Sequence, residues 1–248
     1  MATAAPVMMQ PLSPKPPAPA AHAPADPAEV AAVEAVLAGK VLPRLRLGSK
    51  ALASILKDPE DTKQVFILFL VLHARRVPGF LARFMAEPGG AELMAERPAI
   101  DSHGVDFDAL RKLPADTLGG AFARHLDDRG LSPDIFQAPP GVPPAIGYLA
   151  QRMRQSHDIW HVLTGYDTSV PGELALQAFT FAQTRMPGPA LLAVTGALRW
   201  WPEERGVFGL VARGYRRGKA ARSLLAVRWE DLWAVPLATV RAELGIAA

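Results

Sequence analysis

Residues 157–173 read HDIWHVLTGYDTSVPGE and predict two helices joined by a short turn. His157 and His161 are four residues apart, so on a helix they share one face, with their Cβ atoms about 5–6 Å apart. Gly165 is typical of the left-handed residue that follows the last turn of a helix, and a Pro-Gly pair then precedes Glu173. Glu173 therefore begins a second helical segment, from which it could close a site around the two imidazoles.

This spacing is compatible with a metal site, because two neutral imidazoles four residues apart can chelate one divalent ion. Asp158 lies roughly 100° around the helix from His157 and could bind the ion directly or orient an imidazole. Two imidazoles with one or two carboxylates suit zinc, iron, manganese or cobalt better than calcium or magnesium. A His-x-x-x-His pair also occurs in many helices that bind no metal, so the acidic neighbours are what favour a metal here.

The bulk composition excludes several classes of protein. The chain has 248 residues, half of them hydrophobic, which is ample for one large core. It contains no cysteine, so disulfides and thiolate metal sites are excluded and any metal must be held by histidines and carboxylates. The net charge is only +3 and no long basic stripe is present, which argues against a dedicated nucleic-acid-binding protein. The most apolar run, residues 65–72, is far shorter than the ~20 residues of a membrane-spanning helix.

Residues 1–27 differ in composition from the rest of the chain. They are rich in alanine and proline and carry almost no charge, so they are predicted to form a disordered arm, or less simply a docking arm for a partner. They lack the basic start and apolar core of a secretory signal. With the absence of cysteine, this fits a cytoplasmic protein.

From residue 28 onward the sequence is predicted to be almost wholly helical. Apolar residues recur at helical spacing between proline and glycine breaks, and strand-like alternation is essentially missing. Residues 132–144 hold five prolines and are predicted to form a loop before the helix that carries His157. Near the end, helices are predicted over residues 203–217, 219–233 and 236–244. The predicted fold class is therefore all-α, a single helical domain over residues 28–248 with an N-terminal extension.

Three motifs together resemble the coenzyme Q biosynthesis protein 4 family. They are Tyr148-x-x-Gln151-Arg152-x-Arg154-x-x-His157-Asp158-x-x-His161 with Gly165 and Gly172-Glu173, Leu113-Pro114-x-x-Thr117-Leu118-Gly119, and Trp229-Glu230 followed by Val240-Arg241-x-Glu243-Leu244-Gly245-Ile246. The resemblance spans residues 28–248. His125 and the pair Asp127-Asp128 depart from it, because they lie where the family is aromatic and apolar.

The resemblance implies an all-helical protein, often dimeric, that associates peripherally with a membrane. It implies a divalent metal, usually zinc, with His157, Asp158, His161 and Glu173 as its ligands in this chain. It further implies binding of a prenylated quinone precursor, association with other ubiquinone-biosynthesis proteins, and either oxidative decarboxylation at ring carbon 1 or a scaffold role. For a chain without a targeting signal, we expect a cytoplasmic location at the inner face of the membrane.

Arg154 is the candidate catalytic residue. It lies three residues before His157, so it can share that helix face and bind a substrate carboxylate with two parallel hydrogen bonds. The alternatives are a surface arginine or one paired with Asp158. Gln177 could steady Glu173, and Tyr148 could line a pocket, although a core position is the simpler interpretation.

Residues 199–222 combine six arginines and a lysine with Trp200 and Trp201. Basic residues with tryptophans are typical of an anionic membrane interface. The alternative is a solvated helix face with buried tryptophans. The apolar residues of 176–192 could likewise line a prenyl tunnel or simply form a bundle core.

A hydrolase is the third class considered. His-Asp-x-x-His differs from the zinc-protease pattern His-Glu-x-x-His by one methylene, but the shorter Asp158 would reach a metal-bound water less well. An HD-type phosphohydrolase would need two further ligands, for which only His125 and Asp167 are candidates.

Overall fold

The computed structural model describes residues 27–57, 62–134 and 141–246, and all regular secondary structure in these ranges is helical. The predicted all-α class is therefore confirmed. The helices are α1 (Pro27–Leu37), α2 (Val41–Lys57), α3 (Thr62–His73), α4 (Val77–Ala86), α5 (Gly90–Glu96), α6 (Phe107–Lys112), α7 (Leu118–Arg129), α8 (Pro144–Thr164), α9 (Val170–Thr184), α10 (Pro187–Trp200), α11 (Val207–Ala220), the 3₁₀ helix η1 (Trp229–Leu232) and α12 (Leu237–Leu244). The predicted arm lies outside the described residues, apart from Pro27, which begins α1.

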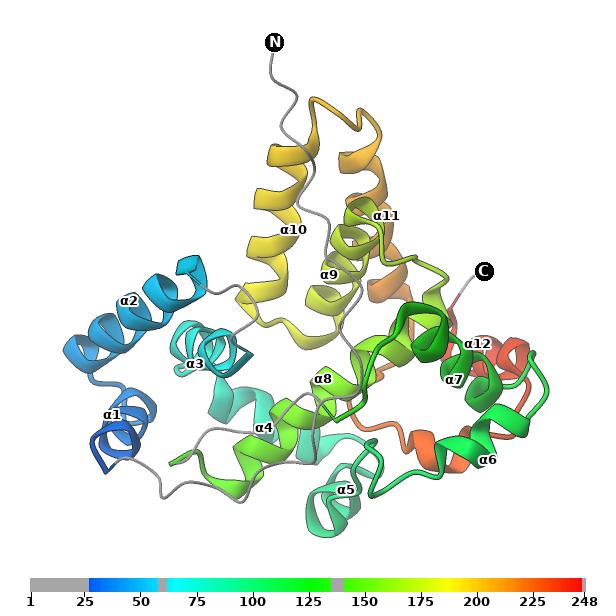
Figure 1. Cartoon of the computed structure of the whole chain (residues 1–248), viewed down its shortest axis with the longest axis horizontal. Coiled ribbons are helices and arrows are strands. Elements are labelled where there is room, and N and C mark those ends of the chain that lie inside the picture. The colour runs from blue at the N-terminus through cyan, green and yellow to red at the C-terminus, as the bar shows by residue number, and fades with distance from the viewer. Residues whose placement is uncertain (1–26, 58–61, 135–140, 247–248) are drawn as a thin grey trace.

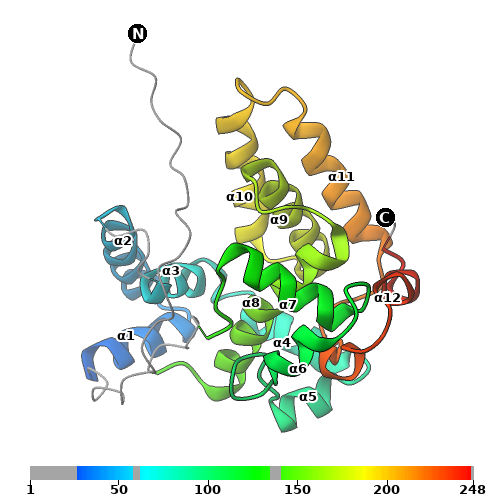
Figure 2. The ribbon, with the colours of Figure 1, turned by 45° about the vertical axis from the view of Figure 1, so that its right-hand side comes forward.

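The long helix α8 runs through the middle of the molecule (Figure 1). Helices α9, α10 and α11 stand above it as a packed group, α6, α7 and α12 gather at its C-terminal half, and α1 to α3 lie toward its other end (Figures 1 and 2). The main core joins α7, α8, α9 and η1 through the buried rings of Phe122, Trp160, Phe179 and Trp229. Each such ring contributes roughly 1.5–3 kcal/mol by leaving water, which fixes the faces of α8 and α9 against each other.

A buried ion pair fastens α8 to the C-terminal part of the chain. The Arg152 side chain is fully buried, and its Nη1 and Nη2 donate to the two carboxylate oxygens of Glu230 at 2.5 and 2.9 Å. Nη2 also donates to the carbonyl oxygen of Val227, and the Trp229 indole N–H donates to the Ser156 hydroxyl. Removing one partner of such a pair leaves an uncompensated buried charge, which costs about 3–5 kcal/mol.

The helix predicted over residues 219–233 is wrong. Helix α11 ends at Ala220, and residues 221–228 are non-helical. Leu224, Leu225 and Ala226 are all buried in this non-helical segment. Gln183 holds this segment instead, because its side-chain amide donates to the Gly218 carbonyl and its carbonyl oxygen accepts from the Leu224 N–H.

Among the described residues, no helix combines the length and the apolar character needed to cross a bilayer. Tyr148 packs in a core cluster with Phe84 and Leu93, as the simpler interpretation of that residue predicts.

Candidate metal centre

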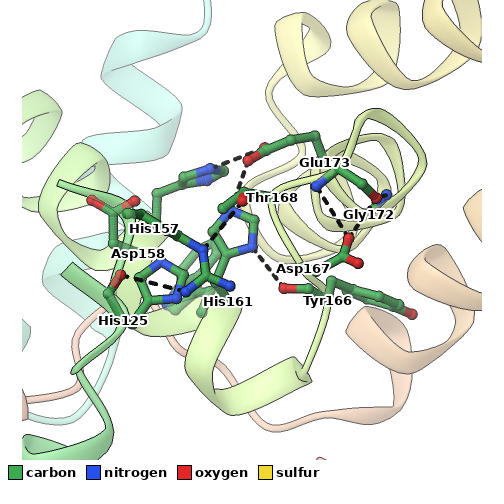
Figure 3. Close-up of polar contacts among 12 residues, drawn as sticks. His125, His157, Asp158, His161, Tyr166, Asp167, Thr168, Gly172 and Glu173 are labelled. Carbon is green, nitrogen blue, oxygen red and sulfur yellow. Dashed lines mark hydrogen bonds and ion pairs between the residues drawn. The ribbon is translucent and has the colours of Figure 1, made fainter. Parts of the chain in front are cut away.

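The corner between α8 and α9 is built tightly (Figure 3). Gly165 ends α8 at φ +71°, a left-handed conformation that glycine adopts without steric cost. Ser169 caps α9, its hydroxyl accepting from the Gly172 N–H at 3.3 Å. A Cβ at Gly172 would collide with the backbone oxygen of Asp167, so only glycine fits there. The corner therefore turns Glu173, in the first turn of α9, back toward α8.

The structure brings three of the four predicted ligands together. Nε2 of His157 lies 3.4 Å from Oε2 of Glu173, and Nε2 of His161 lies 2.9 Å from Oε1. The potential ligand atoms of these three residues all lie within 4.8 Å of one another. The helix spacing of the histidines and the start of α9 at the Pro-Gly pair thus meet in one place, as the sequence predicts.

The chemistry of these donors fits a divalent metal. Nδ1 of His161 lies 2.8 Å from the Tyr166 carbonyl oxygen, which can only accept, so Nδ1 carries a proton. Nε2 is then the nitrogen that would bind a metal through its lone pair, or that donates to Glu173 when the ring is protonated. His161 is 2% exposed, whereas the side chain of Glu173 is 30% exposed, so the cluster is closed on one side and open on the other. Two imidazoles and one carboxylate leave a coordination position for water or substrate on a tetrahedral ion such as zinc.

The charges within the cluster are strongly coupled. Burial alone would raise the pKa of Glu173, but hydrogen bonds with His157 and His161 outweigh it and hold that pKa well below its usual range. Burial likewise disfavours charged His161, yet the hydrogen bond with Glu173 leaves the pKa of His161 raised. A carboxylate at the N-terminal turn of α9 is also stabilised by the helix dipole. Glu173 is therefore ionised over the physiological range, as a metal ligand must be.

Asp158, the fourth predicted ligand, is placed differently. Its Oδ2 accepts from Nη1 of Arg154 at 2.9 Å, one helical turn away, and it is not part of the group formed by the other three. Arg154 is 42% exposed at its side chain, and both residues line a small cavity of about 10 Å³ between α8 and α7, about the size of one water. Gln177, which could have steadied Glu173, is half-buried. Within the described residues it makes no hydrogen bond to Glu173.

His125, on α7, is a neighbour of the site that spacing did not indicate. Its ring stacks on that of His161 with centroids 5.4 Å apart, and its buried Nε2 has no hydrogen-bond partner within the described chain. Burial, and next the charge of Arg129, lower the pKa of His125 to about 4, so the ring is neutral near pH 7. The sequence showed His125 as a departure from the family pattern and as a candidate ligand of the hydrolase interpretation, not as a neighbour of His161. Asp167, the other candidate of the hydrolase interpretation, is used in the corner, where it accepts from the Ser169 N–H and hydroxyl.

Comparisons with known proteins show which family this chain resembles. The family model described as coenzyme Q (ubiquinone) biosynthesis protein Coq4 matches residues 34–248. A mitochondrial ubiquinone biosynthesis protein COQ4 homolog from Drosophila ananassae is 32% identical over 206 residues, covering 82% of this chain and 77% of the relative. The corresponding mitochondrial protein of Talaromyces stipitatus is 31% identical, covering 84% of this chain and 74% of the relative.

A solved structure extends the similarity to the fold. The crystal structure of a ubiquinone biosynthesis protein from Nostoc punctiforme superposes with a TM-score of 0.65 at 30% identity, covering 83% of this chain and 97% of that one. The family match covers all three motifs and every residue of the metal centre. The chain therefore belongs to the coenzyme Q (ubiquinone) biosynthesis protein Coq4 family.

Proposed function

We propose that this protein is a metal-dependent enzyme of ubiquinone biosynthesis that acts at carbon 1 of a prenylated 4-hydroxybenzoate-type ring. The reaction replaces the ring carboxylate by a hydroxyl group in a two-electron oxidation, in which the ring acid, dioxygen and water give the hydroxylated ring, carbon dioxide and hydrogen peroxide. Family membership supports the pathway. The observation that carries the chemistry is the convergence of His157, His161 and Glu173 at one partly open position.

A divalent ion held by these residues would polarise the ring carboxylate and place it for loss. Zinc, the proposed metal, has no redox chemistry, so on zinc the electrons must pass between the electron-rich phenol and dioxygen. Iron, manganese or cobalt would suit the same donors.

The chain's own residues orient the substrate in this proposal. Arg154 uses one of its guanidinium nitrogens to hold Asp158, which leaves further N–H groups for a substrate carboxylate. Asp158 then acts as the residue that aims Arg154, or as a fourth metal ligand after a rotamer change. The neutral ring of His125 closes the side of the site away from solvent and adds no charge there.

The proposal includes a lipid environment. Helix α10 exposes Leu191, Leu192, Val194 and Leu198, and Trp201 at the tip of the α10–α11 hairpin is 41% exposed, so the tryptophans are not simply core residues. Arg213 and Arg216 are exposed on α11. Exposed apolar side chains on α10 and exposed arginines on α11 favour peripheral contact with an anionic membrane, where a prenylated precursor would be found. Other ubiquinone-biosynthesis proteins and a second copy of the chain are the further proposed partners.

Turnover by the isolated protein tests the proposal. Purified protein loaded with zinc, or in parallel with iron or manganese, is supplied with dioxygen and a carboxylated prenyl-phenol. We expect carbon dioxide and the hydroxylated ring, and no product with His157→Ala. The matched control is His103→Ala, since that histidine is exposed and outside the metal centre.

The competing role is a non-catalytic scaffold that binds lipid and organises the biosynthetic proteins. It predicts that variants of the metal centre which still fold and bind lipid support normal quinone synthesis in cells that lack the protein. That result, together with no turnover by the metal-loaded protein, would replace the enzyme proposal by the scaffold.

A further inference from the structure

A second hollow lies at the other end of α9 from the metal centre. It has a volume of about 410 Å³, within the range of small-molecule sites, and lies where α9, α10 and α11 meet the turn between α3 and α4. Figures 1 and 2 show this junction, with the lower end of α10 beside α3. The hollow is lined by Arg76, Phe181, Ala182, Arg185, Pro187, Ala190, Tyr215 and Lys219.

The charged groups of this hollow are all positive. Arg76, Arg185 and Lys219 come from three different segments, and no carboxylate is among the lining residues. None of their side chains takes part in an ion pair or hydrogen bond with the described residues. The field of Arg185 is felt nearby, because burial and next that charge lower the pKa of Arg83. Like charges gathered without a counter-charge repel one another, so an anion in the hollow would relieve the repulsion.

The backbone at Arg185 is a second and independent observation. Arg185 caps α9 at φ +57°, a left-handed position where glycine is the usual residue. Arg97 is the other non-glycine residue with positive φ in the described chain, and its Nε donates to the Met94 carbonyl at the end of its own helix. The side chain of Arg185 makes no such bond and instead lines the hollow. The left-handed backbone at the end of α9 thus holds the Arg185 side chain at the hollow, although glycine would take this conformation without strain.

The remaining wall is apolar. The rings of Phe181 and Tyr215 stack with centroids 5.9 Å apart and an interplanar angle of 25°, and both line the hollow beside Ala182 and Ala190. A ligand that fills this space therefore presents an anion to the three cations and an apolar or aromatic body to the two rings. Planar guanidinium groups match the oxygens of a phosphate in paired hydrogen bonds, and a lysine adds a point charge.

We propose that this hollow is a binding site for a phosphate group carried on an apolar or aromatic body, separate from the metal centre. The phosphate belongs either to a soluble phosphorylated compound or to a phospholipid headgroup, which share this chemistry.

Calorimetric titration of the full chain with phenyl phosphate, in a phosphate-free buffer of low salt, tests the site. We expect one phenyl phosphate per chain, bound more tightly than inorganic phosphate, and no binding of phenol. Arg76→Gln, Arg185→Gly and Lys219→Gln should each weaken binding roughly tenfold, since each removes a charge-assisted contact. Tyr215→Ala should weaken binding of phenyl phosphate and leave that of inorganic phosphate unchanged. Thermal melts confirm that each variant folds.

The controls separate this site from general attraction and from the metal centre. Arg75→Gln and Lys112→Gln remove the same charge from exposed positions outside the hollow, and should change the affinity less than about twofold. His161→Ala should bind phenyl phosphate as the unmodified protein does. A triple variant combines Arg76→Gln, Arg185→Gly and Lys219→Gln. The proposal is overturned if no probe binds or if the triple variant binds phenyl phosphate normally. It is also overturned if the exposed controls weaken binding equally, or if His161→Ala abolishes binding.

Vesicles distinguish the two sources of phosphate. Phosphatidylcholine vesicles with and without phosphatidic acid are added to the protein. Binding that needs phosphatidic acid, is lost in the triple variant and is displaced by phenyl phosphate identifies a lipid headgroup. Binding of phenyl phosphate alone identifies a soluble compound.

Discussion

The two ends of α9 treat charge in opposite ways. At its N-terminal end, Glu173 meets two histidines, and each charge has a partner within the chain. At its C-terminal end, Arg185 meets Arg76 and Lys219 without a counter-charge. Both choices agree with the helix dipole, which favours a carboxylate at the start and cations at the end. The helix dipole and the sequence thus determine which sign of charge stands at each end of α9. Whether that charge already has a partner of opposite sign, or is still available to a ligand, depends on the segments packed around it.

The largest expected effect is a loss of metal at the N-terminal end of α9, where Glu173 meets the two histidines. Glu173→Ala, His157→Ala and His161→Ala should each reduce divalent metal from one ion per chain to near none, because each removes one of three ligands. Metal analysis of the purified proteins measures this, with Gln177→Ala as the control on the same helix. Stoichiometric metal in all three variants would mean that the N-terminal end holds an ion pair and nothing more.

Protonation of His73, which would add a further positive charge near the C-terminal end of α9, should destabilise the fold. His73 lies beside this end, and its Nδ1 contacts the Phe69 carbonyl while its Nε2 accepts from the Gly188 N–H at 2.8 Å. Burial lowers the pKa of His73, and the nearby charge of Arg76 lowers it further against the backbone hydrogen bond. A histidine with a lowered folded pKa contributes stability above its unfolded value near 6.5, and that stability is lost as pH falls from there through the folded pKa.

Protonation would turn the accepting Nε2 into a donor facing an N–H group, which costs about 1–3 kcal/mol. Urea unfolding at pH 7 and pH 5 should therefore show a larger acid loss for the unmodified protein than for His73→Gln. An equal loss of stability in both proteins would show that protonation of His73 is not what destabilises the protein at pH 5.

Relief of backbone strain should act in the other direction. Arg185→Gly keeps the left-handed conformation at no steric cost and removes one of the repelling cations, so the free energy of unfolding should rise by about 1 kcal/mol. Denaturant unfolding measures the change. Arg213→Gly would be unsuitable as a control, because Arg213 lies within α11 and glycine inside a helix is itself destabilising. Arg213→Ala, which removes the same charge without changing the backbone, should leave stability within about 0.5 kcal/mol.

The smallest effect is expected at Asp158. Asp158→Asn should leave one metal per chain, with affinity reduced by about tenfold, because the carboxylate orients neighbours rather than joining the three-residue group. The ion pair with Arg154, one helical turn away, contributes only about 0.3–0.5 kcal/mol to stability. Complete loss of metal in this variant would instead make Asp158 a fourth ligand.

The local features of this fold could be predicted because their causes lie within a few residues. Pro144 and Gly165 bound α8, and the four-residue spacing of His157 and His161 fixes one helix face. The features that could not be predicted depend on contacts between distant segments. The stacking of His125 on His161 follows from the packing of α7 on α8, and the non-helical path after Ala220 follows from hydrogen bonds to Gln183. Helical periodicity carries no information about either.

The pairing of Arg152 with Glu230 places a constraint on synthesis of the chain. Arg152 precedes Glu230 by 78 residues, so during translation Arg152 is synthesised while its carboxylate partner is still missing from the chain. Until Glu230 and Trp229 emerge, burying that part of α8 would leave a bare charge in the core. The helix that carries both histidines should therefore take its final position late in translation, and a stop codon before residue 229 should yield a chain that is degraded rather than one that merely lacks its last helix.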